Sequence, residues 1–279
     1  MQRSMLVLSA SSLIALTTCG DVTSAAVASP SVQALRHGAP SPGPSALTVV
    51  LVHGAFADGS SWAGVTERLQ KAGVNVLVTV NPLRGLTSDG EYVASVVRQI
   101  PGPVLLVGHS YGGPVITYAG TKASNVKGLV YIASFGLQKG ESVLDNAGKY
   151  PPTLLATALE PRTYPNSTTP EFSIQRDKYR EVFAADLPVN LTNVLAVSQR
   201  PAAATANAEP LAVEPAWKTL PSWFLVATQD HTIHPDSERA AANLMHATTL
   251  EVNASHSVAV SRPGVVADFI LKALTTLNK

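Results

Sequence analysis

The chain has 279 residues, 46% of them apolar and 14% charged, and 20 Lys and Arg offset 19 Asp and Glu to leave a net charge of +1. This balance argues against a nucleic-acid-binding protein, which needs a clustered surplus of Lys and Arg. The apolar content argues against intrinsic disorder. The single cysteine excludes an internal disulfide framework and a cysteine-based zinc site.

The N-terminal residues have the layout of a secretory signal peptide. An apolar stretch at residues 5–16 follows the positive charge of Arg3, and Ala26-Val27-Ala28 offers a small-x-small cleavage site. The apolar stretch is too short to span a bilayer comfortably. We therefore expect residues 1–28 to be removed on export to the periplasm or the medium.

Two other interpretations of this leader stay open. Leu16-Thr17-Thr18-Cys19 resembles a bacterial lipoprotein box, although Thr18 stands where Gly, Ala or Ser is usual. Processing there would anchor the protein to the membrane surface through lipidated Cys19. The leader could also be a disordered cytosolic segment. Residues 29–46, rich in Ser, Pro, Gly and Ala, are expected to form a flexible linker.

From Leu47 onward, β-branched runs alternate with amphipathic stretches. Strands are expected at 47–52, 74–80, 104–107, 126–133, 223–228 and 249–252. Helices are expected at 60–72, closed by Gly73, then from a capping box of Ser88 and Glu91 to residue 100, at 112–123 and at 263–277. Strands separated by helices predict an α/β domain over 47–279 with a doubly wound, mostly parallel sheet.

Residues 137–220 break this alternation, being rich in proline and without a clear strand pattern. Such an insertion between two sheet strands predicts a lid over the strand ends. Six apolar lid residues could line a pocket or pack as ordinary core: Leu154, Leu155, Phe172, Ile174, Phe183 and Trp217.

Gly108-His109-Ser110-Tyr111-Gly112 is a G-x-S-x-G motif. The expected strand at 104–107 directly precedes it and the expected helix from Gly112 follows it. A sharp strand-to-helix turn of this kind exposes the serine hydroxyl at a helix N-terminus. We interpret Ser110 as a catalytic nucleophile; the alternative is a serine that only caps a helix.

A serine nucleophile needs a histidine base, and the histidines after Ser110 are His231, His234, His246 and His256. His256 follows the expected strand 249–252 in a short loop, at the same sheet edge as Ser110. It is therefore the preferred base, with His231 or His234 as alternatives. His246 ends a helix, where interaction with the helix dipole suffices to explain it.

The base in turn needs an orienting carboxylate. Asp230 stands just past the strand 223–228, again at a carboxyl end, and is the preferred acid. Glu141 is the alternative after the preceding strand, whereas Asp236 fits the N-terminus of the next helix. Asp230 with His231 and His234 could also suggest a metal site, but a third well-placed ligand is missing.

The oxyanion hole should consist of two backbone N–H groups. Tyr111, the residue after the nucleophile, supplies one. The loop after the first strand, His53-Gly54-Ala55-Phe56, should supply the other, and Gly54 would let the backbone approach the reacting carbonyl. Ala55 N–H is thus the second candidate donor, unless this loop is only an ordinary turn.

These motifs resemble the α/β-hydrolase fold family. The stretch from Leu51 to Trp62 is similar to the His-Gly-Ala start of the compact branch of methylesterases and hydroxynitrile lyases, which share the Gly-His-Ser-Tyr-Gly-Gly turn. The resemblance covers residues 47–274 except the lid. It implies a triad of Ser110, Asp230 and His256, oxyanion donors at Ala55 and Tyr111, and no cofactor.

The resemblance also bears on the reaction. Hydroxynitrile lyases of this branch have Thr at the position of Gly54 and Lys directly after the triad histidine, where this chain has Ser257. Hydrolysis of a small, apolar ester through an acyl-enzyme on Ser110 is therefore expected. Other triad-dependent reactions, such as those of cofactor-free haloperoxidases or dioxygenases, and a non-catalytic ligand-binding relative remain alternatives.

Overall fold

The computed structural model describes residues 47–278. The predicted signal peptide, the alternative lipidation of Cys19 and the predicted linker at 29–46 concern residues outside this range. Within it, no helix is both long and apolar enough to cross a membrane.

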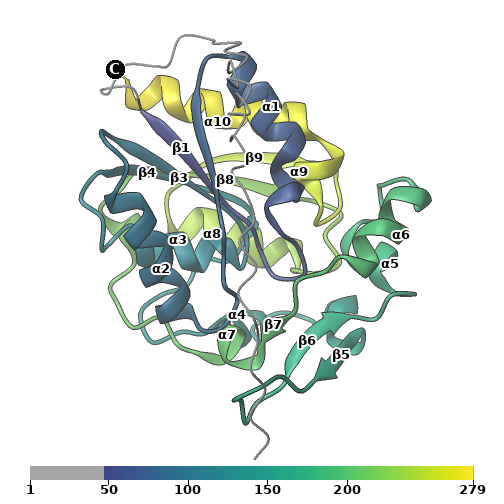
Figure 1. Ribbon diagram of the computed structural model, residues 1–279. Coiled ribbons are helices and arrows are strands. Elements are labelled where there is room, and N and C mark those ends of the chain that lie inside the picture. Colours follow the sequence, from purple (N-terminus) through teal and green to yellow (C-terminus); the bar gives the residue numbers. More distant parts are fainter. Residues whose placement is uncertain (1–46, 279) are drawn as a thin grey trace, which may run out of the picture. The chain divides into compact units, whose positions relative to one another are not determined.

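A six-stranded sheet forms the centre of the domain (Figure 1). All of its strands are parallel, and their order is β2-β1-β3-β4-β8-β9. The strands are β1 (Thr48–Val52), β2 (Asn75–Thr79), β3 (Val104–Ser110), β4 (Val126–Ser134), β8 (Ser222–Ala227) and β9 (Thr248–Val252). This confirms the predicted α/β fold and each of the six predicted strands.

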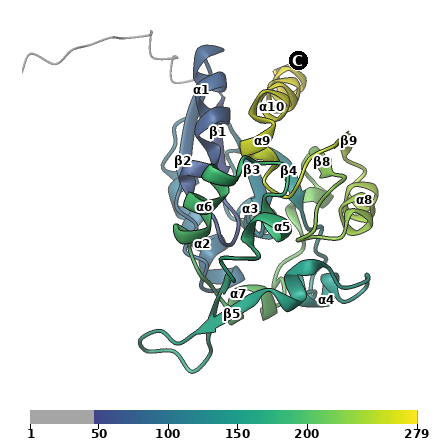
Figure 2. The same ribbon diagram turned by 90° about the vertical axis from the view of Figure 1, so that its right-hand side faces the viewer.

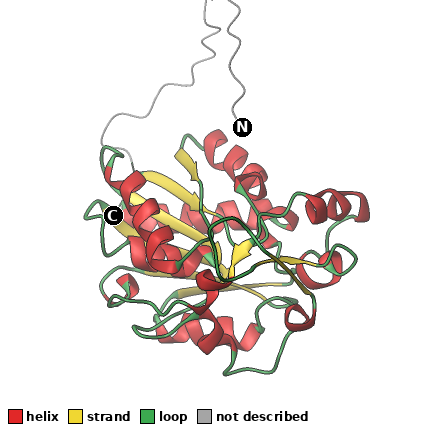
Figure 3. Cartoon of the chain, turned by 60° about the horizontal axis from the view of Figure 1, so that its bottom comes forward, coloured by secondary structure: helices red, strands yellow, loops and turns green. Residues whose placement is uncertain are grey.

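Alternate residues of the central strands face opposite sides of the sheet. In β1, Val49 and Leu51 pack toward one face, with α1 (Ala63–Lys71), α9 (Val258–Ser261) and α10 (Pro263–Leu277). Val50 and Val52 pack toward the other, with α2 (Leu86–Arg98), α3 (Gly112–Ala119) and α8 (Pro235–Leu244). Because both faces are covered (Figures 2 and 3), β1 and β3 are wholly buried, and both are apolar up to the Gly-His-Ser end of β3.

The strand order places two loops at the switch point of the sheet. From β1 the chain crosses to β2 on one side, and it returns to β3 on the other side of β1. Carboxyl ends of strands on either side of such a reversal form the usual ligand crevice of open α/β sheets. The loops after β1 and β3, which begin at His53 and Tyr111, therefore meet at this crevice.

The predicted capping box of α2 is wrong. Helix α2 begins at Leu86 with Gly85 as its N-cap, so Ser88 lies inside the first turn and its hydroxyl donates to the carbonyl of Gly85 at 3.0 Å. Glu209, from the lid side, instead accepts from the N–H of Thr87 at 3.3 Å. A carboxylate far away in the sequence therefore accepts a hydrogen bond at the N-terminus of α2, where Ser88 and Glu91 were predicted to form the cap.

The insertion between β4 and β8 contains more regular structure than the sequence suggested. A three-stranded antiparallel sheet joins β5 (Leu159–Arg162), β6 (Glu171–Ile174) and β7 (Ala202–Ala203). The lid also contains α4 (Val143–Ala147), α5 (Tyr179–Phe183), α6 (Val189–Val197), α7 (Ala204–Ala208) and two 3₁₀ helices. The expectation of no strand was wrong because Pro161 is tolerated on the edge strand β5.

Candidate active site

Ser110 ends β3 and has a φ of +52°, in the left-handed region that non-glycine residues rarely adopt. The glycines on either side make this turn possible. A Cβ on Gly108 would lie 2.5 Å from the carbonyl oxygen of Gly112, and a Cβ on Gly112 would lie 2.5 Å from that of Val52. The predicted strand-to-helix turn is therefore present, with the strained serine at its apex.

His256 and Asp230 are joined at a second point on the same sheet edge. Oδ2 of Asp230 lies 2.5 Å from Nδ1 of His256, and both side chains are fully buried. Oδ1 of Asp230 accepts from the N–H groups of Thr232 and Ile233 at 2.6 and 2.9 Å. A carboxylate fixed in this way holds the proton on Nδ1 and leaves Nε2 as the free lone pair.

Nε2 of His256 is buried and has no hydrogen-bond partner in the part of the chain that the structure describes. The bond from Ser110 Oγ that a complete triad requires is thus not formed. Catalytic hydrogen bonds are often long until substrate binds. The structure joins the predicted acid and base and leaves Nε2 of the base unpaired among the described residues.

His109, a residue that the sequence analysis left without a role, connects the two loops. Its Nε2 donates to the carbonyl oxygen of His256 at 2.9 Å, and the two rings lie 4.7 Å apart. Burial, and then the neighbouring His256, hold the pKa of His109 well below its usual range. His109 is therefore neutral, and it ties the loop of the base to the residue next to Ser110.

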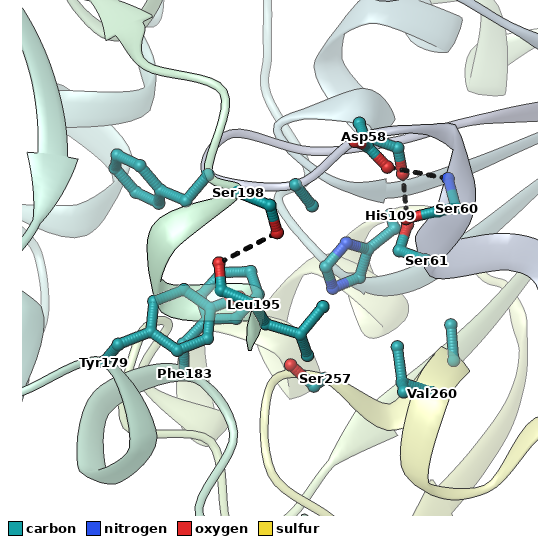
Figure 4. A pocket seen from close by; sticks show the side chains of 13 residues that line it. Asp58, Ser60, Ser61, His109, Tyr179, Phe183, Leu195, Ser198, Ser257 and Val260 are labelled. Carbon is teal, nitrogen blue, oxygen red and sulfur yellow. Dashed lines mark hydrogen bonds between the residues drawn. The ribbon is translucent and has the colours of Figure 1, made fainter. Parts of the chain in front are cut away.

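The ring of His109 also borders a small pocket of about 20 Å³, which Figure 4 shows between lid residues such as Phe183 and the loop near Asp58. This volume has room for about one water molecule. An ester molecule does not fit in it.

The loop after β1 is held by a second buried histidine. Nε2 of His53 accepts from the N–H of Asn81 at 3.1 Å, so its proton is on Nδ1, which donates to the carbonyl of Gly54 at 2.9 Å. Burial lowers the pKa of His53, which keeps the ring neutral. The side chain of Asn81 also donates to the carbonyl of His53 at 2.8 Å. The turn at Gly54 is thus a fixed one.

Gly54 lies against the nucleophile. A Cβ at this position would lie 2.6 Å from Cβ of Ser110 and 3.2 Å from its Oγ. Ala55 and Tyr111, the two expected oxyanion donors, both line the same cavity as Ser110. Neither N–H donates to a backbone acceptor within residues 47–278.

The alternative acids and bases are engaged elsewhere. Nδ1 of His231 bonds the carbonyl of Glu181 at 2.9 Å, and His234 caps α8, accepting from the N–H of Asp236 at 3.2 Å. Glu141 lies at the start of the lid, where its carboxylate pairs with Lys149 and accepts from Asn146.

The remaining expectations concern His246 and a metal. His246 lies two residues beyond the end of α8. The suggested metal cluster does not form: Asp230 is committed to His256 and two N–H groups, and residues 47–278 contain no group of three His, Cys, Asp or Glu side chains that could hold a metal ion.

A cavity of about 450 Å³ opens beside Ser110. Most of its lining is apolar, and none of its lining residues is Lys, Arg, Asp or Glu. Two of the six apolar lid residues, Leu155 and Phe172, do line it. Leu154 is exposed, and Ile174 and Trp217 are buried in the core.

Residues 49–269 match the Alpha/beta hydrolase family. A carbendazim-hydrolysing esterase of Nocardioides sp. (strain SG-4G) is 30% identical over 160 residues, 53% of this chain and 62% of that esterase. The chain thus spans less than two thirds of that curated relative.

Solved structures with the same fold include a pyrethroid hydrolase of Sphingobium faniae JZ-2, with a TM-score of 0.69 and 19% identity over 83% of this chain and 98% of that one. They also include a methylesterase of Arabidopsis, with a TM-score of 0.67 and 21% identity over 82% and 99%. The chain belongs to the α/β hydrolase family.

Proposed function

We propose that this protein is a serine hydrolase that cleaves carboxylic esters. The observation that carries the proposal is the buried Asp230–His256 pair, whose free nitrogen, Nε2, has no partner among residues 47–278. An unpaired polar atom costs stability when buried, and a catalytic role is one explanation for such an atom. Ser110 has a strained backbone and is connected to the loop of His256 through His109. Its hydroxyl is the group that this nitrogen would deprotonate.

The mechanism follows from these positions. Nε2 of His256 takes the proton of Ser110 as Oγ attacks the ester carbonyl, and Asp230 stabilises the resulting imidazolium. The N–H groups of Ala55 and Tyr111 stabilise the tetrahedral oxyanion. His256 then protonates the leaving alcohol, and a water molecule, activated by the same histidine, hydrolyses the acyl-enzyme and restores Ser110.

The cavity supports a neutral, apolar substrate. Its lining contains no Lys, Arg, Asp or Glu, so a charged substrate would lose its hydration without an ion pair to one of these residues. Its volume exceeds that of a short acyl group. Two similar proteins, a carbendazim-hydrolysing esterase and a pyrethroid hydrolase, are named for small organic substrates.

Hydrolysis is favoured over cyanohydrin cleavage. Lyase chemistry needs a cation beside the base to stabilise departing cyanide. The residue after His256 is Ser257, which is buried, and the cavity lining contains neither Lys nor Arg.

The test is covalent labelling combined with an ester screen. A fluorophosphonate probe should label the wild type and not Ser110→Ala, and p-nitrophenyl esters of graded acyl length should be hydrolysed by the wild type and not by Ser110→Ala. Ser198→Ala, which removes an exposed lid hydroxyl, is the matched control and should be labelled normally. Equal labelling of Ser110→Ala, or an unlabelled wild type, would contradict the proposal.

We also propose that the mature enzyme is exported, because of the leader described above. Intact mass spectrometry of the protein from its native host should give a chain that starts at Ser29. A start at an acylated Cys19 would establish a lipid anchor instead, and an uncleaved chain would exclude both.

A further inference from the structure

The side chain of Tyr111 ends on a buried carboxylate that the proposed mechanism does not use. Its hydroxyl donates to Oδ2 of Asp89 at 2.9 Å. Asp89 is fully buried and Tyr111 is 1% exposed. A hydrogen bond to an ionised acceptor in such surroundings is stronger than one at the surface.

Asp89 is itself held in place by the backbone. The N–H of Arg84 donates to both carboxylate oxygens, at 3.2 and 3.0 Å, and Asp89 lies in the first turn of α2, where negative charge is favourable. Burial raises the pKa of Asp89, while the donors Arg84 N–H and Tyr111 hydroxyl act in the opposite direction. Burial and the charge of Asp89 raise the pKa of Tyr111 well above its usual value, so the phenol keeps its proton and donates.

This anchor acts on a critical peptide unit. Tyr111 follows the strained Ser110 and is the N-cap of α3, with a φ of −54°. Its N–H belongs to the peptide between Ser110 and Tyr111, whose orientation decides where an oxyanion donor points. Two hydrogen bonds hold this region. The hydroxyl of Ser134 donates to the carbonyl of Ser110 at 2.6 Å, and the hydroxyl of Tyr111 donates to Asp89.

We propose that Asp89 is a positioning residue for the oxyanion hole, acting through the hydroxyl of Tyr111 to fix the direction of the Tyr111 N–H. This inference rests on the proposed ester hydrolysis, because it concerns one donor of that reaction. Asp89 touches neither substrate nor the reacting atoms: its effect passes through one side chain and one peptide unit.

The chain supplies a matched control. Tyr118, about two helical turns further along α3, donates its hydroxyl to Oε1 of Glu91 on α2 at 2.8 Å. Both pairs join a tyrosine at or in α3 to a carboxylate on α2. Only the pair of Tyr111 and Asp89 is buried next to Ser110, so the two pairs differ in their connection to the site.

The experiment compares Tyr111→Phe and Asp89→Asn with Tyr118→Phe and Glu91→Gln. Loss of a whole oxyanion donor lowers kcat by about 10²–10³-fold, so a donor that is only misdirected should lower it by about 10–100-fold. We expect that loss in Tyr111→Phe and Asp89→Asn with KM nearly unchanged, and a parallel loss of affinity for a trifluoromethyl ketone that forms a tetrahedral adduct. The control variants should keep kcat within about twofold.

A double variant, Tyr111→Phe with Asp89→Asn, should lose less than the product of the two single losses, because both remove one interaction. Equal kcat in Tyr111→Phe and Tyr118→Phe, with lower melting temperatures only, would reduce the pair to a structural role and overturn the inference. If Asp89→Asn does not fold, Tyr111→Phe, which loses one oxygen atom, decides alone. An unlabelled wild type would instead overturn the proposed function itself, and this inference with it.

Discussion

The ring of Phe183, on lid helix α5, packs against the ring of His256 with centroids 4.7 Å apart and planes at 67°. The backbone is joined at the same place, because the N–H of Ser257 donates to the carbonyl of Phe183 at 3.0 Å. The lid therefore does more than cover the cavity: it forms one wall of the position that the proposed base occupies.

Phe183→Ala should lower kcat by about tenfold or more, because a ring that can tilt spends less time aligned with Ser110. The loss should appear with short and long acyl esters alike, since Phe183 does not line the larger cavity. Phe183→Leu keeps most of the apolar volume and should recover much of the rate. Steady-state kinetics on both esters measures this, and a loss confined to the long ester would assign Phe183 to substrate binding instead.

Asp230→Asn should lower kcat by about 10⁴-fold, since an amide cannot hold the proton on Nδ1 of His256 while stabilising the imidazolium. Asp236→Asn is the control: this carboxylate lies in the first turn of α8 and is mostly exposed. It should change kcat less than twofold. Comparable losses in both variants would show that charge near α8, and not the contact with His256, is what matters.

Gly54→Ala should abolish most activity, because the added Cβ would lie 2.6 Å from Cβ of Ser110 and 2.9 Å from the carbonyl oxygen of His109. One of the two loops must then shift, and a shift of about 1 Å can cost about 10²-fold in rate. Gly264→Ala is the matched substitution, since its Cβ would meet only Arg68 Nε at 3.5 Å. It should leave kcat and stability intact; full activity in Gly54→Ala would remove this loop from the site.

The sequence was enough to predict the framework that positions Ser110, Asp230 and His256. Strands buried on both faces read as continuous apolar runs, and parallel strands bring their carboxyl ends to one edge. Ser110 ends such a run and Asp230 follows one, whereas His256 follows β9, an edge strand that is largely exposed. Because parallel strands end at the same edge of a sheet, the sequence predicts that these three residues lie at one edge.

Other features needed contacts that no local pattern carries. His109 bonds the carbonyl of a residue 147 positions away, and His53 owes its tautomer to Asn81, which looks in sequence like a simple strand ending. At the N-terminus of α2, the N–H of Thr87 donates to Glu209 of the lid. The nearby Ser88 therefore led to a wrong prediction of the cap. Only the assembled fold selects these partners.

A further carboxylate, Glu238, is completely buried near the same edge. Its Oε2 accepts from the N–H of Ala227 at 2.9 Å, while Oε1 has no partner within the described chain. Burial, and then the charge of Asp230, raise the pKa of Glu238 well above its ordinary 4.5. The carboxyl group is thus neutral when folded under conditions in which the unfolded chain would ionise it.

A raised pKa in the folded state means that stability is lost as the pH rises from about 4.5 through the folded-state value. Glu238→Gln is neutral at every pH, so its melting temperature relative to the wild type should be higher at pH 8 than at pH 5. Glu67→Gln, at an exposed site paired with Lys71, should show a flat difference over this range because the pKa of Glu67 is lowered, not raised. Circular dichroism melts at four pH values measure both. A flat difference for Glu238→Gln would mean that Glu238 is ionised in the fold, beside the charge of Asp230.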